Sequence, residues 1–136
     1  MGSSQEIKTI MKRYYLNEIR DNEELYNLYK EQITQEKITE AFEVAIKSKD
    51  IQAVEDIFHI GFVLNLFNNF DCKIFCVLLK EQWHNRHEDI ARLFQHSCNR
   101  DSSNIPILLG ATKSLPYYLQ SDDMKYPYIR KIIYAI

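Results

Sequence analysis

NRHEDIARLF, residues 85–94, indicates most clearly which secondary structure this chain builds. Asn85 offers a side-chain oxygen that can cap a helix, and Glu88 follows three residues later, which is the pattern of a capping box. The apolar residues that follow recur at the spacing of one helix face: Ile90, Leu93 and Phe94. The stretch therefore predicts a helix that begins near Asn85 and buries this apolar face.

Helical spacing of apolar residues continues on both sides of this stretch. It predicts helices over residues 5–19, 25–46 (as one long helix or two short ones), 51–60, 74–82, 106–115 and 122–136. We expect Asp50 to cap the helix at 51–60 and Gly61 to end it. Pro106 suits the first turn of its helix, and Pro127 is tolerated only in a first turn. The last helix is expected to bury Tyr128, Ile129, Ile132, Ile133 and Ile136.

The composition agrees with a helical domain. The 136 residues are 46% apolar and 26% charged, which is close to the average of globular proteins, and they include only three Gly and three Pro. An all-β fold would need more turn residues than this. We predict one all-α domain over residues 1–136, with residues 1–10 partly disordered. Its short antiparallel helical hairpins would stack as a HEAT-like α-solenoid or form a compact helical bundle.

The sequence carries no sign of secretion, membrane insertion or nucleic-acid binding. The longest apolar run, residues 105–111, is too short to span a bilayer, and no apolar stretch follows a basic start. The three cysteines are odd in number, so we expect a reduced, cytoplasmic protein. Cys98, with His96 and Arg100 nearby, is the one thiol worth testing as a nucleophile. The net charge of −2 gives no basic field for phosphates, which leaves a protein as the expected partner.

His84 and His87, beside Glu88 and Asp89, form the sharpest candidate for chemistry. Zinc requires three or four converging ligands, and only two further histidines are present in the chain: His59 and His96. The alternative is structural, with the two acids placed at the start of a helix, where they complement its dipole. We favour this alternative and predict no catalytic residue, no cofactor and no metal, with His84 and His87 as the metal candidates if it fails.

Tyrosines and acidic residues supply a candidate partner-binding set. The chain has nine tyrosines, a residue type that anchors protein interfaces. The Tyr117-Tyr118 pair shortly precedes Asp122-Asp123, and this acidic pair suits either a basic partner or a helix N-terminus. The predicted partner-binding residues are Glu88, Asp89, Tyr117, Tyr118, Asp122 and Asp123.

LLKEQWHNRHEDIARLFQ, residues 78–95, resembles a block of small HEAT-repeat-like bacterial proteins. Several of those proteins are similar to immunity proteins of polymorphic toxin systems, including contact-dependent growth inhibition systems. The specific part is WHxxHEDI at residues 83–90, and the resemblance covers about residues 41–136, where Lys131 to Ile136 is similar to the family's closing block. The chain departs from the family because it stops at Ile136 and because a loop at 99–104 replaces a Pro-containing turn.

The resemblance implies an immunity protein, or antitoxin, that neutralises a cognate toxin domain by occluding its active site. Nuclease toxins of such systems are commonly basic, and acidic patches would speed association with them. A helical-repeat scaffold for another cytoplasmic partner is the main alternative. The remaining alternatives are a nucleic-acid-binding repeat and a metal-dependent hydrolase built on His84, His87 and Glu88.

Overall fold

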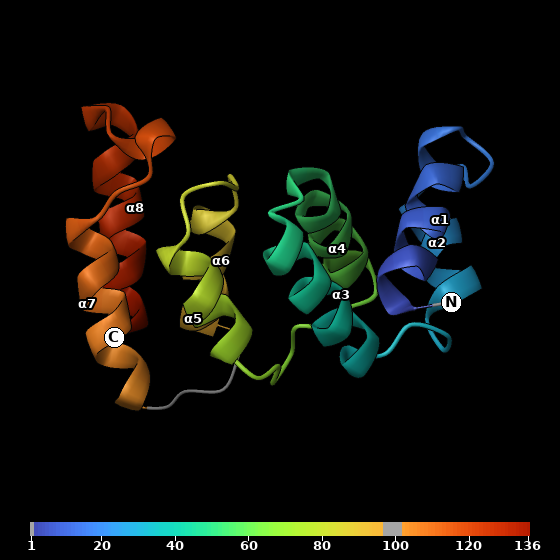
Figure 1. The fold of residues 1–136 in the computed structure, drawn as a ribbon, viewed down its shortest axis with the longest axis horizontal. Coiled ribbons are helices and arrows are strands. Elements are labelled where there is room, and N and C mark those ends of the chain that lie inside the picture. The colour runs from blue at the N-terminus through green and yellow to red at the C-terminus, as the bar shows by residue number, and fades with distance from the viewer. Residues whose placement is uncertain (1, 97–101) are drawn as a thin grey trace. The chain divides into compact units, whose positions relative to one another are not determined.

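Every regular element in the computed structural model of this chain is helical within the described residues, 2–96 and 102–136 (Figure 1). The prediction of an all-α fold is therefore confirmed. The chain divides into two compact units, Met1–Phe67 and Asn68–Ile136. The single domain over residues 1–136 stays a prediction. Within the described part of the chain, no helix is both long and apolar enough to cross a membrane. Cys98 and residues 99–101 of the predicted loop lie outside the described residues.

The first unit contains four helices: α1 (Ser3–Tyr15), α2 (Asn22–Tyr29), α3 (Gln35–Ser48) and α4 (Ile51–Val63). α1 packs on both α3 and α4, and α2 packs on α4. Figure 1 shows α3 and α4 side by side, joined by a tight turn in which Lys49 adopts a left-handed conformation with φ of 51°. Residues 25–46 therefore belong to two helices, the second of which is capped by the Thr34 hydroxyl.

The ends of α4 follow one prediction and contradict another. The Asp50 carboxylate accepts a hydrogen bond of 3.0 Å from the Ala53 amide, so its predicted capping role is confirmed. Gly61 does not end the helix, because α4 continues to Val63. A Cβ atom at Gly61 would lie 2.2 Å from Cζ of Phe67, whose ring is buried. This glycine therefore lets an aromatic ring approach the helix backbone.

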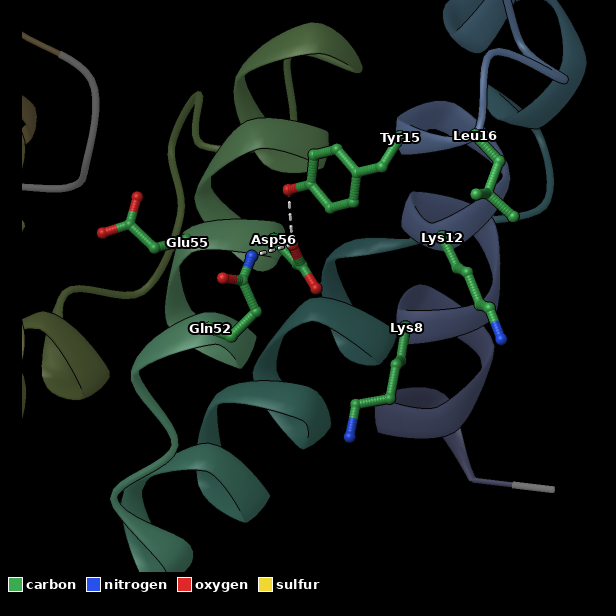
Figure 2. Close-up of a pocket in the computed structure, with 7 residues that line it drawn as sticks. All are labelled: Lys8, Lys12, Tyr15, Leu16, Gln52, Glu55 and Asp56. Carbon is green, nitrogen blue, oxygen red and sulfur yellow. Dashed lines mark hydrogen bonds between the residues drawn. The ribbon is translucent and has the colours of Figure 1, made fainter.

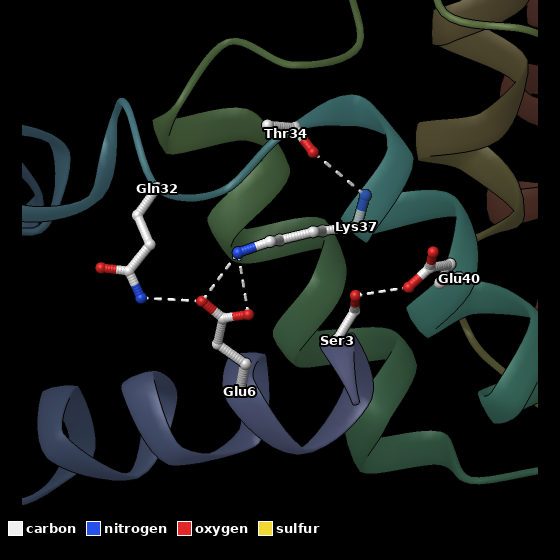
Figure 3. Close-up of polar contacts among 6 residues, drawn as sticks. All are labelled: Ser3, Glu6, Gln32, Thr34, Lys37 and Glu40. Carbon is white, nitrogen blue, oxygen red and sulfur yellow. Dashed lines mark hydrogen bonds and ion pairs between the residues drawn. The ribbon is translucent and has the colours of Figure 1, made fainter. Parts of the chain in front are cut away.

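Polar side chains connect α1 to the start of α3 (Figure 3). The Glu6 carboxylate accepts a 2.7 Å hydrogen bond from Gln32 and pairs with the Lys37 ammonium at 3.1 Å. These two contacts, the Gln32 bond first, lower the pKa of Glu6. One turn earlier, the Ser3 hydroxyl donates a 2.6 Å hydrogen bond to Glu40. The network fixes the position of α1 along α3.

The second unit contains α5 (Lys73–Lys80), α6 (His87–His96), the short 3-10 helix η1 (Ser102–Asn104), α7 (Ile105–Lys113), the short 3-10 helix η2 (Tyr117–Leu119) and α8 (Asp122–Ala135). α6 and α7 both pack on α8, and α5 packs on α6 and α7. Pro106 lies in the first turn of α7, as predicted. The predicted capping box does not form in its expected register, because α6 begins at His87 and Arg86, not Asn85, directly precedes it.

α8 buries a narrower apolar face than predicted. Tyr128 and Ile132 are fully buried, but Ile133 and Ile136 are 55% and 44% exposed. The reason is geometric, since consecutive helical residues point about 100° apart and positions 132 and 133 cannot both face the same neighbour. Pro127 lies in the second turn of α8, beyond the first turn to which it was expected to be confined.

Candidate partner-binding face

The side of α8 that faces solvent carries a group of large exposed side chains, which we call the α8 outer face: Asp123, Tyr126, Arg130, Ile133 and Tyr134. Tyr126, Ile133 and Tyr134 are 57%, 55% and 68% exposed. Relative to Tyr126, the other members stand at positions −3, +4, +7 and +8, which is the spacing of one helix face. The face is therefore a continuous stripe about three turns long.

The opposite side of α8 explains why this stripe stays in solvent. Tyr128 and Ile132 are buried where α8 packs on α6 and α7. Pro127 is exposed on the outer side, and because it has no amide hydrogen it leaves the Asp123 carbonyl without its usual helical donor. A helix tolerates this loss where water can reach the carbonyl. The helix therefore packs on one side only.

The residue types of the α8 outer face are those that dominate protein interfaces. Tyrosine and arginine are enriched among interface residues whose truncation costs the most binding energy. At the start of the face, Lys125 lies 4.8 Å from the centre of the Tyr126 ring and 3.3 Å from the Asp122 carboxylate. Asp123 has no ion-pair partner among the described residues. The face thus combines exposed aromatic surface with one carboxylate available to a cation.

The structure separates the six predicted partner-binding residues into two sets. Tyr117 is 89% exposed on η2, which packs on α8, and Asp122 and Asp123 are exposed at the start of that helix. Asp123 belongs to the α8 outer face, Asp122 directly precedes it on the same helix, and Tyr117 lies on η2, so these three are exposed to a partner. The other three are engaged within the second unit, namely Tyr118, Glu88 and Asp89.

The acidic pair of α6 has internal partners. Glu88 pairs with Lys131 of α8 at 2.8 Å, and Asp89 pairs with Arg86 at 2.9 Å. Both carboxylates are half-buried. Glu88 therefore fixes α6 against α8, and Asp89 holds Arg86, which precedes α6, against the first turn of that helix. Both carboxylates thus offer little free charge to a partner. Sequence reasoning missed Tyr126, Arg130 and Tyr134, although their helical spacing was readable once Tyr128 was assigned to the core.

His84 and His87 form a buried imidazole stack. Their ring centres are 4.2 Å apart with an angle of 6° between the planes, and neither side chain is exposed. His84 Nε2 lies 2.6 Å from the Leu78 carbonyl, and His87 Nε2 lies 2.7 Å from the Glu81 carbonyl. Because a carbonyl only accepts, both Nε2 atoms carry the hydrogen. The stack thereby holds the loop between α5 and α6 in place.

The second nitrogen of each ring is an acceptor that is also in use. His84 Nδ1 accepts from the Arg86 amide at 3.1 Å, and His87 Nδ1 accepts from the Tyr118 hydroxyl at 3.0 Å. Burial lowers the pKa of His87 to about 4, and His84 contributes to the same shift. Burial also raises the pKa of Tyr118 to about 12. His87 is therefore neutral at pH 7, and neither imidazole has a lone pair left to bind a metal, because all four ring nitrogens have hydrogen-bond partners.

The residues that carry the family resemblance thus have structural tasks in the second unit. Trp83 is half-buried and packs edge-on against His84 with ring centres 5.2 Å apart. His84, His87 and Glu88 hold a loop and a helix pair in place, as described above. Over the described part of the chain, no three His, Cys, Asp or Glu side chains converge in a way that could hold a metal ion. Comparison with protein families, with curated proteins and with solved structures finds no match for this chain.

Proposed function

We propose that this chain is a non-catalytic immunity protein that binds a cognate toxin domain and neutralises it by occluding its active site. The observation that carries the proposal is the α8 outer face, where Tyr126 and Tyr134 are more than half exposed beside an arginine. A partner protein would bury these rings with little loss of side-chain entropy. The immunity role itself comes from the resemblance of residues 78–95.

The charge near this face favours a basic partner. Asp122 and Asp123 are exposed, and Asp123 is not neutralised by any described cation. Acidic groups of this kind raise the association rate with a cationic surface more than they raise affinity. A basic nuclease domain fits this requirement. The state of His84 and His87 gives the metal-dependent hydrolase no support, because all four ring nitrogens already have hydrogen-bond partners.

The first test is to purify the protein from its host with its neighbouring genes expressed and to identify co-eluting proteins by mass spectrometry. We expect a toxin domain in stoichiometric amount, and we expect co-expression of this chain to restore growth to cells that produce that domain. A partner that binds without being neutralised would favour the scaffold alternative. Recovery of the chain alone, in the presence of a neighbouring toxin, would contradict the proposal.

The second test asks whether the α8 outer face makes the contact. Replacing Tyr126 and Tyr134 by alanine should weaken toxin binding at least 30-fold, since truncation of interface anchors costs about 2 kcal/mol or more. The matched control is Tyr26→Ala on α2, which removes a tyrosine that is 41% exposed in the other unit. Both variants should keep the wild-type unfolding free energy within about 0.5 kcal/mol. Equal binding by the two variants would exclude this face as the contact.

A further inference from the structure

A groove with charged walls lies between α1 and α4 in the first unit (Figure 2). Its volume is about 620 Å³, which is within the range of binding sites in proteins. One wall is formed by Lys8, Lys12 and Tyr15 of α1, and the other by Gln52, Glu55 and Asp56 of α4. We call it the α1/α4 groove. It belongs to a different unit from the α8 outer face.

The α1 wall is cationic because of a simple helical register. Lys8, Lys12 and Tyr15 follow one another at four and three residues, so their side chains share one side of the helix. Both lysines are exposed, and neither forms an ion pair with any described carboxylate. In Figure 2 the Lys8 side chain extends to the left of α1 and the Lys12 side chain to its right. Two ammonium groups are thus available to an anion along the groove.

The α4 wall holds a carboxylate that is buried without a cation. Asp56 is only 4% exposed. Its Oδ1 atom accepts hydrogen bonds from the Tyr15 hydroxyl at 2.6 Å and from the Gln52 amide at 3.0 Å. Both donors are neutral, and no described residue donates to Oδ2. Figure 2 shows this second oxygen directed into the space between the two helices.

A buried carboxylate normally has a cationic partner, because desolvation of an unpaired charge is costly. Tyr15 and Gln52 satisfy one oxygen of Asp56, and the other points into the groove. A guanidinium or ammonium group that entered the groove would form a charge-assisted hydrogen bond to that oxygen. To contact the lysines of the opposite wall as well, the same ligand would also need an anionic group. The groove therefore selects for a ligand with both charges.

We propose that the α1/α4 groove binds a segment of a partner protein whose arginine side chain meets Asp56 and whose acidic side chain meets Lys8 and Lys12. From Lys8 to Tyr15 the wall is roughly 10 Å long, at about 1.5 Å per helical residue, which matches about three extended residues. The groove is open along its length, which suits a chain segment. This site goes beyond the proposed function, because it needs neither α8 nor a toxin.

The test is an NMR titration of the ¹⁵N-labelled full chain with the blocked peptide acetyl-Arg-Ala-Glu-amide. We expect saturable shifts of amide signals in α1 and α4, around Lys12 and Asp56. The control peptide contains citrulline in place of arginine, which keeps the shape and removes the charge. It should bind at least tenfold more weakly, because it cannot form a charge-assisted bond to Asp56. Equal affinity for the two peptides, or no saturable shifts in the groove, would overturn the proposal.

Variants of each wall complete the test. Asp56→Asn retains an acceptor for Tyr15 and Gln52 but removes the charge, and should lower affinity for the arginine peptide at least tenfold. The double variant Lys8→Glu, Lys12→Glu should do the same from the opposite wall. Lys47→Glu is the matched control, because Lys47 is an exposed α3 lysine outside the groove.

If Asp56→Asn perturbs the fold, as its amide spectrum would reveal, the lysine variant and the citrulline peptide decide the question. Unchanged affinity in the lysine variant would overturn the proposed acidic contact. The Tyr126→Ala, Tyr134→Ala variant should bind the peptide normally. Loss of toxin binding at α8 and loss of peptide binding at the groove are therefore separate results.

Discussion

Acid should destabilise the second unit through His87. Its pKa is about 4 in the folded chain, against the ordinary value of 6.5, so between these pH values the unfolded chain binds a proton that the folded chain does not. The resulting stability is complete above pH 6.5 and falls as the pH drops toward 4. At 1.36 kcal/mol per pKa unit, the loss between pH 7.5 and pH 5 is about 2 kcal/mol from this one group.

The assay is urea unfolding at pH 7.5, 6, 5 and 4.5, followed by fluorescence of Trp83, the single tryptophan, which lies in the same unit as His87. The control is His87→Phe, which has no group to titrate at this position. The variant should be less stable at pH 7.5, because the Glu81 carbonyl and the Tyr118 hydroxyl lose their partner. Its unfolding free energy should nevertheless fall about 2 kcal/mol less than that of the wild type between pH 7.5 and 5. Parallel pH curves for the two proteins would refute the assigned state of His87.

Three further predictions concern stability and can be measured by urea unfolding followed by far-ultraviolet circular dichroism, because one of the variants removes the single tryptophan. Gly61→Ala should lower the unfolding free energy by about 1–3 kcal/mol, because the added methyl group meets the buried ring of Phe67. Gly110→Ala should be neutral or stabilise by up to about 1 kcal/mol, because nothing lies within 4 Å of its added carbon. Equal effects of the two substitutions would contradict the packing argument. Trp83→Phe should cost less than about 1.5 kcal/mol, because the buried indole N–H has no acceptor among the described residues, and a larger loss would show that it has one. Asp50→Ala should cost about 1 kcal/mol through loss of the cap of α4, and an unchanged midpoint would contradict that role.

The helical structure of most segments and their approximate positions could be predicted from the sequence, because the spacing of apolar residues is a local signal. The cap of α4 was predictable for the same reason, since Asp50 bonds an amide only three residues away. The role of Gly61 was not, because it depends on where the ring of Phe67 packs. The start of α6 was misplaced because either Asn85 or Arg86 can directly precede the helix. The hydrogen bond from the Arg86 amide to His84 fixes the loop so that the helix begins at His87. The spacing of apolar residues along the sequence does not reveal contacts that are made across a loop.

The candidate site was harder to predict because charge in a sequence does not reveal which charges are already paired. Glu88 and Asp89 look like a surface patch, yet Lys131, far along the chain, neutralises the first and Arg86 the second. Tyr126 and Tyr134 look like core residues until the buried face of α8 is known. That face is set by α6 and α7, which bury Tyr128 and leave positions 126 and 134 in solvent. The same reasoning applies to the α1/α4 groove, where Asp56 is an ordinary helix residue in sequence. It becomes a binding candidate only because the packed helices bury it beside the neutral Tyr15 hydroxyl of α1 and give it no ion-pair partner among the described residues. In both units, the packing of neighbouring helices determines which charged side chains are paired internally and which remain available to a partner. Tests of function should therefore compare variants of paired and of unpaired charged residues on the same helix.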